Sequence, residues 1–363
     1  MKKNKNYVDL KDQPVPEGQH LLEVDDLKMY FRTEDGVVRA VDGVSYTLDR
    51  GETLGVVGES GSGKSVTAMT IMGLISMPPG KIEGGDVRYR GRSILEMTEE
   101  EMQHIRGNDI AMIFQDPMTS LNPVYKIGKQ VGEGLRLHRG YSKQEALKRA
   151  TELLDLVGIP EPEKRVNEYP HQFSGGMRQR VMIAMALACD PDILIADEPT
   201  TALDVTIQAQ IIELMQEMQE KNGNAIIMIT HDLGVVADMA DKIMVMYAGR
   251  PVEFGTAEEI FYESRHPYTW GLIRSIPEQA IDEKKPLTPI HGNPPSLMNL
   301  PEGCVFSPRC PYATDKCRKQ RPERVVTESG HYSACHYSGD PAFLKNAPET
   351  SRTRKDSKKG GEA

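Results

Sequence analysis

A glycine-rich octapeptide between two apolar runs constrains this 363-residue chain more than any other feature. The octapeptide GESGSGKS spans Gly58 to Ser65, after TLGVV and before VTAMTIMGL. A strand that turns through glycines into a helix directs backbone N–H groups at one point, which suits a phosphate. Lys64 adds positive charge for β- and γ-phosphates, and Ser65 adds a hydroxyl for Mg²⁺. The predicted phosphate-loop contacts are Gly58, Ser60, Gly61, Gly63, Lys64 and Ser65.

A second candidate site follows the apolar run DILIADEP, which ends in Asp197 and Glu198. The carboxyl end of a strand in an open α/β sheet is where ligands bind. Asp197 is suited to hold Mg²⁺ through water, and Glu198 is suited to polarise an attacking water. The alternative for this pair alone is an exposed acidic turn after a core strand. The phosphate loop with Lys64 argues against that alternative.

The strand and helix patterns divide the chain into segments. The apolar runs DILIAD and NAIIMIT are separated by the helical pattern TIQAQIIELMQEMQEK, which predicts a parallel sheet covered by helices. LLEVDDLKMYF alternates like half-buried strands, and Ser142 is a candidate N-cap of a helix. We expect a flexible terminus over 1–20, a nucleotide-binding domain over 21–256 with a helical subdomain at about 95–180, an extension over 257–345 and a disordered tail over 346–363.

Composition excludes several classes of protein. Hydrophobic residues at 39% and charged residues at 27% are typical of a soluble globular chain. No run approaches the roughly 18 apolar residues that a membrane span needs. The start MKKNKNYVDLKDQ has no apolar region behind it, so it does not predict a secretory signal, and we expect a cytoplasmic protein. The net charge of −9 argues against a nucleic-acid partner.

Further segments resemble the motifs of the ATP-binding-cassette (ABC) ATPases. They are FSGGMRQRVMIAMAL from Phe173 (signature segment), FQDP with Gln115 (Q-loop), TALD ending at Asp204 (D-loop) and ITHDL with His231 (switch histidine). They lie in the family's order over roughly residues 22–256. The signature departs from the family at Met177, where Gln is usual, but its serine and paired glycines are present.

The resemblance implies an α/β fold with a mainly parallel sheet core, an antiparallel β subdomain and a helical subdomain. It also implies ATP hydrolysis by two cassettes that hold two ATP molecules head to tail. Ser174, Gly175 and Gly176 would then offer a hydroxyl and N–H donors to the nucleotide of the other subunit. An ordinary helix N-cap is the alternative for this tripeptide.

The same resemblance implies roles for single residues around ATP. His231 would hold the γ-phosphate and the water in line, although a buried histidine with satisfied hydrogen bonds is an alternative. Gln115 would sense Mg²⁺ and the γ-phosphate, and Asp204 would lie at the nucleotide. Phe31 falls at the family's position for stacking on the base. Tyr30 competes for that role, and either side chain could belong to the strand core.

Longer segments narrow the resemblance to one group of transporters. MIFQDPMTSLNP and RHPYTWGLI are similar to the D-type ATPase of dipeptide and oligopeptide ABC importers. This implies a heterodimer with an F-type ATPase, two membrane permease subunits, an extracytoplasmic peptide-binding protein, and a peripheral place on the cytoplasmic face of the membrane. The alternatives are an importer ATPase for another solute such as nickel, and a soluble iron–sulfur ABC ATPase that acts on ribosomes or DNA.

Four of the five cysteines lie near the C-terminal end: Cys304, Cys310, Cys317 and Cys335. Four thiolates can hold an iron–sulfur cluster or zinc, whereas disulfides are rare in the cytoplasm. The importer family has cysteines at similar spacing and some members bind a [4Fe–4S] cluster, so the resemblance implies an irregular metal-binding extension with that cluster. Zinc and free thiols remain alternatives, and a mixed zinc site could use His291, His331 or His336. Cys189 is read as a small buried hydrophobe.

Overall fold

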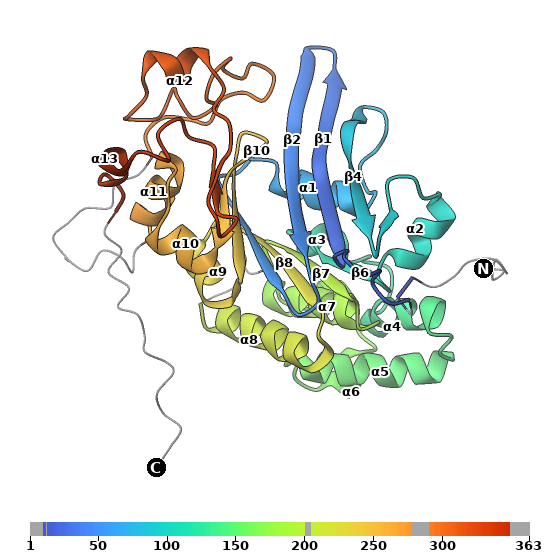
Figure 1. The fold of residues 1–363 in the computed structure, drawn as a ribbon. Coiled ribbons are helices and arrows are strands. Elements are labelled where there is room, and N and C mark those ends of the chain that lie inside the picture. Colours follow the sequence, from blue (N-terminus) through green and yellow to red (C-terminus); the bar gives the residue numbers. More distant parts are fainter. Residues whose placement is uncertain (1–9, 12, 200–204, 277–289, 349–363) are drawn as a thin grey trace.

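The computed structural model describes residues 10–11, 13–199, 205–276 and 290–348, which form two sheets with helices around them (Figure 1). One sheet is antiparallel, with the strand order β2-β1-β4-β5. Its strands are β1 (Leu22–Thr33), β2 (Gly36–Leu48), β4 (Gly80–Tyr89) and β5 (Arg92–Ser93). The half-buried alternation of β1 confirms the strand that was predicted from LLEVDDLKMYF.

The second sheet has eight strands in the order β11-β12-β10-β9-β3-β8-β7-β6. These are β3 (Thr53–Val57), β6 (Ile110–Ile113), β7 (Ile193–Asp197), β8 (Ala225–Thr230), β9 (Lys242–Tyr247), β10 (Arg250–Thr256), β11 (Val325–Val326) and β12 (Tyr332–Ser333). The strands from β9 to β6 are parallel, and β10 pairs antiparallel with β9. The mainly parallel core that the sequence predicts is therefore confirmed.

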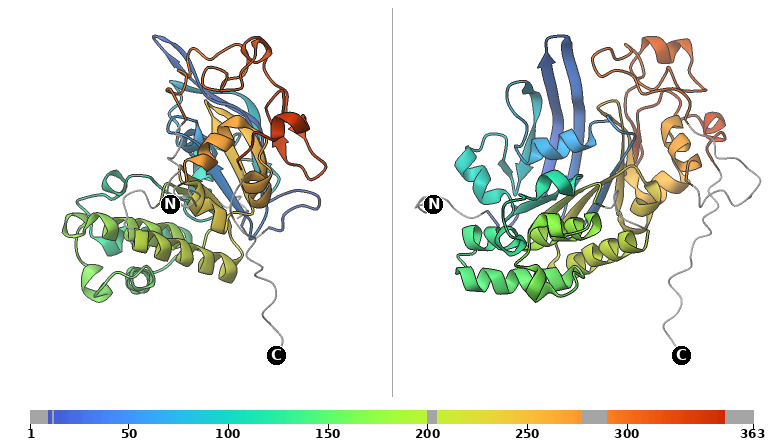
Figure 2. Two further views of the ribbon diagram at one scale, coloured as in Figure 1. Left: turned by 90° about the vertical axis from the view of Figure 1, so that its left-hand side faces the viewer. Right: turned by 180° about the vertical axis from the view of Figure 1, so that it is seen from behind.

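The helices before β7 belong to two groups. Helices α1 (Lys64–Ile71) and α2 (Glu99–Ile105) pack in the core between the two sheets. The others are α3 (Pro117–Ser120), α4 (Ile127–His138), α5 (Lys143–Leu156), α6 (Pro162–Arg165) and α7 (Gly175–Leu187). Of these, α4, α5 and α7 share a second core, here called the helical layer. Helix α5 begins as predicted at Ser142, whose hydroxyl accepts from the Glu145 N–H in a capping box. Helices α4, α5 and α6 lie at the end of the molecule opposite to the C-terminal helix α12 (Asp315–Lys319) (Figures 1 and 2).

The later helices are α8 (Val205–Asn222), α9 (Leu233–Met239), α10 (Ala257–Tyr262), α11 (Pro267–Arg274) and α13 (Pro341–Leu344). Helix α8 joins β7 to β8, as the strand–helix–strand pattern predicts. Among the helices of the described residues, none has the length and apolar character needed to cross a membrane.

The C-terminal extension is continuous with the large sheet, although the sequence reads as irregular. Strand β12 pairs antiparallel with β10, through Glu253 opposite Ser333 and Phe254 opposite Tyr332. The Glu253 side chain is fully buried, 3.0 Å from His331 Nε2, and it also accepts the backbone N–H of His266 at 3.3 Å. A buried carboxylate needs such partners, so this contact fastens the extension to the cassette.

The start of the described chain also packs against the cassette. Leu10 lies inside the segment that was expected to be a flexible terminus, yet it is 5% exposed and belongs to the core between the two sheets. Lys11 Nζ donates to the backbone oxygens of Asn108 and Cys189 at 3.1 and 3.0 Å. Residues 10 and 11 therefore have fixed places in the structure.

Candidate nucleotide site

The Gly58–Ser65 loop connects β3, which lies between the parallel strands β9 and β8, to helix α1. Gly63 caps the helix with φ 101°, a conformation that favours glycine. A Cβ atom at Gly58 would lie 2.2 Å from the Met246 carbonyl oxygen, and one at Gly63 would lie 2.3 Å from that of Ala40. Packing against neighbouring backbone therefore requires glycine at both positions.

Lys64 lies inside the loop rather than in solvent. Its side chain is buried, and Nζ donates to the carbonyl oxygens of Gly58 at 2.7 Å and Glu59 at 3.0 Å. Burial lowers the pKa of the ammonium, while the carboxylates of Glu198 and Asp197 oppose that shift. The loop thus holds an ammonium whose charged form is stabilised by any anion brought beside it.

Ser65 and Asp197 meet where the loop faces the end of β7. The Ser65 hydroxyl donates to Asp197 Oδ1 at 2.9 Å, and Asp197 is 3% exposed. Burial raises the pKa of Asp197, whereas the Ser65 hydrogen bond and Lys64 lower it. Mg²⁺ prefers one or two protein oxygens together with waters and substrate phosphates, so this pair fits that ion.

Glu198 is the point on which the other predicted catalytic residues converge. Gln115 Nε2 donates to Glu198 Oε2 at 2.9 Å, and His231 Nδ1 lies 3.4 Å from Oε1. Gln115, Glu198 and His231 follow the neighbouring parallel strands β6, β7 and β8. The carboxyl ends of parallel strands share one edge of the sheet, which explains how residues so distant in sequence meet.

The signature residues lie at the start of α7. Ser174 is its N-cap, and its hydroxyl accepts from the Met177 N–H at 3.3 Å. Ser174 and Gly175 are exposed, and Gly176 is half-buried. Met177, the departure from the family, packs against the core of the helical layer. The predicted D-loop residue Asp204 lies outside the described residues.

The two candidates for base stacking have different surroundings. Tyr30 donates its hydroxyl to Asp42 Oδ1 at 2.9 Å, and burial together with this bond raises the pKa of Tyr30 to about 12. Phe31 packs partly against the core between the sheets, opposite Val38 and Gly80. Tyr30 is engaged elsewhere, and the stacking role of Phe31 stays a prediction.

The four C-terminal cysteines line one cavity. Its walls also include His266, Phe306, Tyr312, His336, Tyr337 and Phe343. All four are free thiols, and burial raises the pKa of Cys310 to about 11 and that of Cys335 to about 12, with neighbouring thiols adding to both shifts. Within the described ranges, no group of three or more His, Cys, Asp or Glu is arranged to hold a single metal ion.

The three histidines considered as zinc ligands are placed differently. Only His336 of the three is among the residues lining the cavity. His331 is paired with Glu253, and the backbone oxygen of His291 accepts from Arg309 Nε at 2.9 Å. The structure adds His266, a cavity residue that no sequence pattern singled out.

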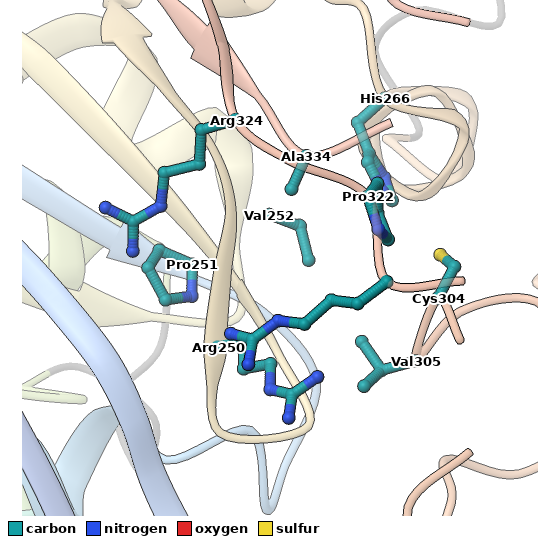
Figure 3. Close-up of a pocket in the computed structure, with 10 residues that line it drawn as sticks. Arg250, Pro251, Val252, His266, Cys304, Val305, Pro322, Arg324 and Ala334 are labelled. Atoms are coloured by element: carbon teal, nitrogen blue, oxygen red, sulfur yellow. The ribbon is translucent and has the colours of Figure 1, made fainter. Parts of the chain in front are cut away.

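A second pocket adjoins this cavity and shares His266 and Cys304 with it (Figure 3). Arg250, Arg324 and Cys304 are among its lining residues. Arg250, a residue of the cassette, is held by Asp42, with Nη2 2.6 Å from Oδ2. Because Cys304 lines both spaces, the thiol cavity adjoins a pocket that cassette residues also line.

Comparison with known proteins agrees with this geometry. The chain matches the family described as ABC transporter over residues 41–201, and the oligopeptide/dipeptide transporter C-terminal region over residues 252–317. Among solved structures it resembles the dimeric ATP-binding cassette MJ0796 bound to ADP and phosphate, with a TM-score of 0.60 and 29% identity over 65% of this chain and 98% of that one.

Two full-length relatives share most of the chain. The oligopeptide transport ATP-binding protein of Bacillus subtilis is 58% identical over 312 residues, 86% of this chain and 87% of that protein. The dipeptide transport ATP-binding protein of Escherichia coli is 52% identical over 322 residues, 89% of this chain and 98% of that protein. The chain therefore belongs to the ABC transporter ATPases, in the family of oligopeptide and dipeptide transport ATP-binding proteins.

Proposed function

We propose that this chain is the ATP-hydrolysing subunit of a bacterial importer for dipeptides or oligopeptides. ATP binding and hydrolysis at a dimer of cassettes would drive uptake through separate permease subunits. The observation that carries the proposal is the convergence of Gln115 and His231 on Glu198, beside the Ser65–Asp197 pair. The peptide-transport names of the relatives supply the cargo class.

The residues divide the work of phosphoryl transfer as follows. Glu198 accepts a hydrogen bond from the attacking water and polarises it, while Gln115 and His231 hold the carboxylate and the water in line with the γ-phosphate. Lys64 exchanges its loop carbonyls for β- and γ-phosphate oxygens. Ser65 and Asp197 would hold Mg²⁺, Asp197 through water, with Gln115 as the third residue at the ion. The ion would supply positive charge that neutralises the phosphates.

The exposed start of α7 supports a dimer. Ser174, Gly175 and Gly176 would face the ATP held by the other cassette, and Asp204 would lie at the same interface. MJ0796, a structural relative, is itself a dimer with ADP and phosphate. We propose a related F-type ATPase as the partner. Purification of the assembled transporter should recover this F-type ATPase together with the chain. Recovery of two identical chains instead would contradict the proposed partner.

The remaining partners are two permease subunits and an extracytoplasmic peptide-binding protein, with this chain on the cytoplasmic face of the membrane. Deleting the gene should abolish growth on dipeptides or oligopeptides as the sole source of a required amino acid, and the intact gene should restore it. Growth on the free amino acid is the control. Normal growth on peptides combined with lost nickel uptake would contradict the proposed cargo.

We further propose that the four C-terminal thiols hold a [4Fe–4S] cluster. What supports this proposal is that all four thiols line one cavity, where each could bind a different iron of such a cluster. When bound, such a group cross-links a segment that has little apolar core of its own.

Protein purified without oxygen should contain about four irons and four sulfides per chain, with broad absorbance near 400 nm. Cys335→Ser should lose most of the iron, because its thiol lines the cavity. Cys189→Ser is the matched control, since Cys189 is also a buried free thiol but belongs to the core of the helical layer. One zinc per chain without iron, or no metal at all, would overturn the cluster.

A further inference from the structure

Glu59, the second residue of the phosphate loop, is held by an arginine from the C-terminal extension. Arg309 Nη1 lies 2.5 Å from Glu59 Oε2, and Nη2 lies 3.0 Å from Oε1. The Arg309 side chain is 4% exposed and that of Glu59 is 30% exposed. Two parallel contacts between a planar guanidinium and a carboxylate fix both distance and orientation.

Arg309 is itself fixed by its surroundings. Nε donates to the His291 carbonyl oxygen at 2.9 Å, and Nη2 donates to that of Ile290 at 3.2 Å. The guanidinium also contacts Tyr247, whose hydroxyl accepts from Nη1 at 3.4 Å. An arginine with this many partners cannot follow Glu59 if the loop moves, so it acts as an anchor.

The backbone of Glu59 is anchored from the same side. Its N–H donates to the Tyr268 hydroxyl at 2.9 Å. Tyr268 lies on α11, is fully buried and packs against Tyr247 and Phe306, with ring centroids 4.6 and 5.3 Å away. Main chain and side chain of one loop residue are thus both held by residues from beyond β8.

This anchoring bears directly on the groups that meet the phosphates. The carbonyl oxygen of Glu59 accepts from Lys64 Nζ at 3.0 Å and from the Ser62 N–H at 3.2 Å. The orientation of the Glu59 peptide therefore sets part of the loop's curvature. A Glu59 carboxylate without Arg309 would also place an uncompensated negative charge beside a site that must accept ATP phosphates.

We propose that Arg309 is a positioning residue for the phosphate loop, acting through Glu59 on ATP affinity in the same chain. It keeps the loop in its binding conformation and neutralises the one carboxylate within it. The inference rests on the proposed role of the Gly58–Ser65 loop in binding ATP. It holds whether or not the thiols beside Arg309 carry a cluster.

Arg309→Gln in the full chain should weaken ATP binding roughly tenfold or more, a typical size for coupling between two sites. It should raise KM for ATP while leaving kcat at saturating ATP within about twofold, because the residues around Glu198 are untouched. ATP titration calorimetry and phosphate release measure the two quantities. Arg318→Gln is the matched control, since Arg318 lies in the same segment but forms an exposed pair with Asp315 at 3.2 Å.

A double variant separates electrostatic positioning from loss of fold. Glu59→Gln combined with Arg309→Gln removes both charges, so it should recover most of the ATP affinity that Arg309→Gln loses. Arg309→Lys, which keeps the charge but not the planar fork, should fall between wild type and Arg309→Gln. Thermal unfolding of each ATP-free variant shows whether it is folded.

Two results would overturn the inference: wild-type ATP affinity in Arg309→Gln, or a double variant as weak as Arg309→Gln at equal thermal stability. Lys64→Ala in the same assay keeps this failure distinct from failure of the proposed function. If Lys64→Ala also binds ATP like the wild type, the loop is not the ATP site. If Lys64→Ala is weak and Arg309→Gln is normal, only the positioning role is lost.

Discussion

Glu198→Gln is expected to bind ATP with nearly wild-type affinity and to hydrolyse it about a hundredfold more slowly or worse, the usual size of a general-base contribution. The amide has the shape of the carboxylate and leaves the Ser65–Asp197 pair and Lys64 in place. It lacks the negative charge that polarises water. ATP should therefore stay bound and keep the cassette dimer closed.

Calorimetric ATP titration measures the affinity for ATP, and phosphate release at saturating ATP measures the rate of hydrolysis. Light scattering in the presence of ATP detects the trapped dimer. Glu220→Gln is a control, because Glu220 is an exposed residue of α8. Turnover close to wild type in Glu198→Gln would remove Glu198 from the role of base, whatever the dimer does.

Lys64→Ala should lose ATP affinity by about tenfold to a hundredfold, since a charge-assisted hydrogen bond contributes roughly 1.5 to 3 kcal/mol. The effect should appear in binding itself and not only in turnover. Lys64 lies at the position where β- and γ-phosphates are expected, with two loop carbonyls as its present partners. Removing it leaves the phosphate charge without a cation from the loop.

Calorimetric ATP titration measures this loss directly. Lys81→Ala is the control, because Lys81 forms a solvent-exposed pair with Glu83 at 2.9 Å on β4. Thermal unfolding without nucleotide shows whether the variant is folded. An unchanged ATP affinity in folded Lys64→Ala would contradict the assignment of the loop.

The sequence was sufficient to predict functional residues at the carboxyl edge of the parallel sheet. Glu198 and His231 could be placed together because each follows an apolar run of strand length, and parallel strands end at one edge. Gln115 could be placed there only through the family resemblance, because its strand β6 lies inside the stretch that was expected to be helical. The loop glycines could be identified because glycines at this spacing, followed by Lys and Ser, are typical of a phosphate-binding loop. In both cases the information is local, and the fold adds only the adjacency of β6, β7 and β8.

The contacts of the extension could not be predicted in the same way. Arg309 and Glu59 are separated by 250 positions, and nothing in the pattern around either residue points to the other. The pairing of β12 with β10 rests on a two-residue strand, which is too short for periodicity to reveal. His331, considered as a zinc ligand, instead meets Glu253, a strand residue that reads as a surface acid in sequence.

The late strand β12 has a consequence for the order of events during synthesis. Strand β10 is complete once residue 256 has been made, but its outer edge stays open until Tyr332 and Ser333 emerge. During that interval the Glu253 carboxylate also lacks its contact with His331, which has not yet been synthesised. An unpaired edge invites pairing with other chains. The nascent cassette is therefore exposed to such pairing while the residues between 256 and 333 are being translated.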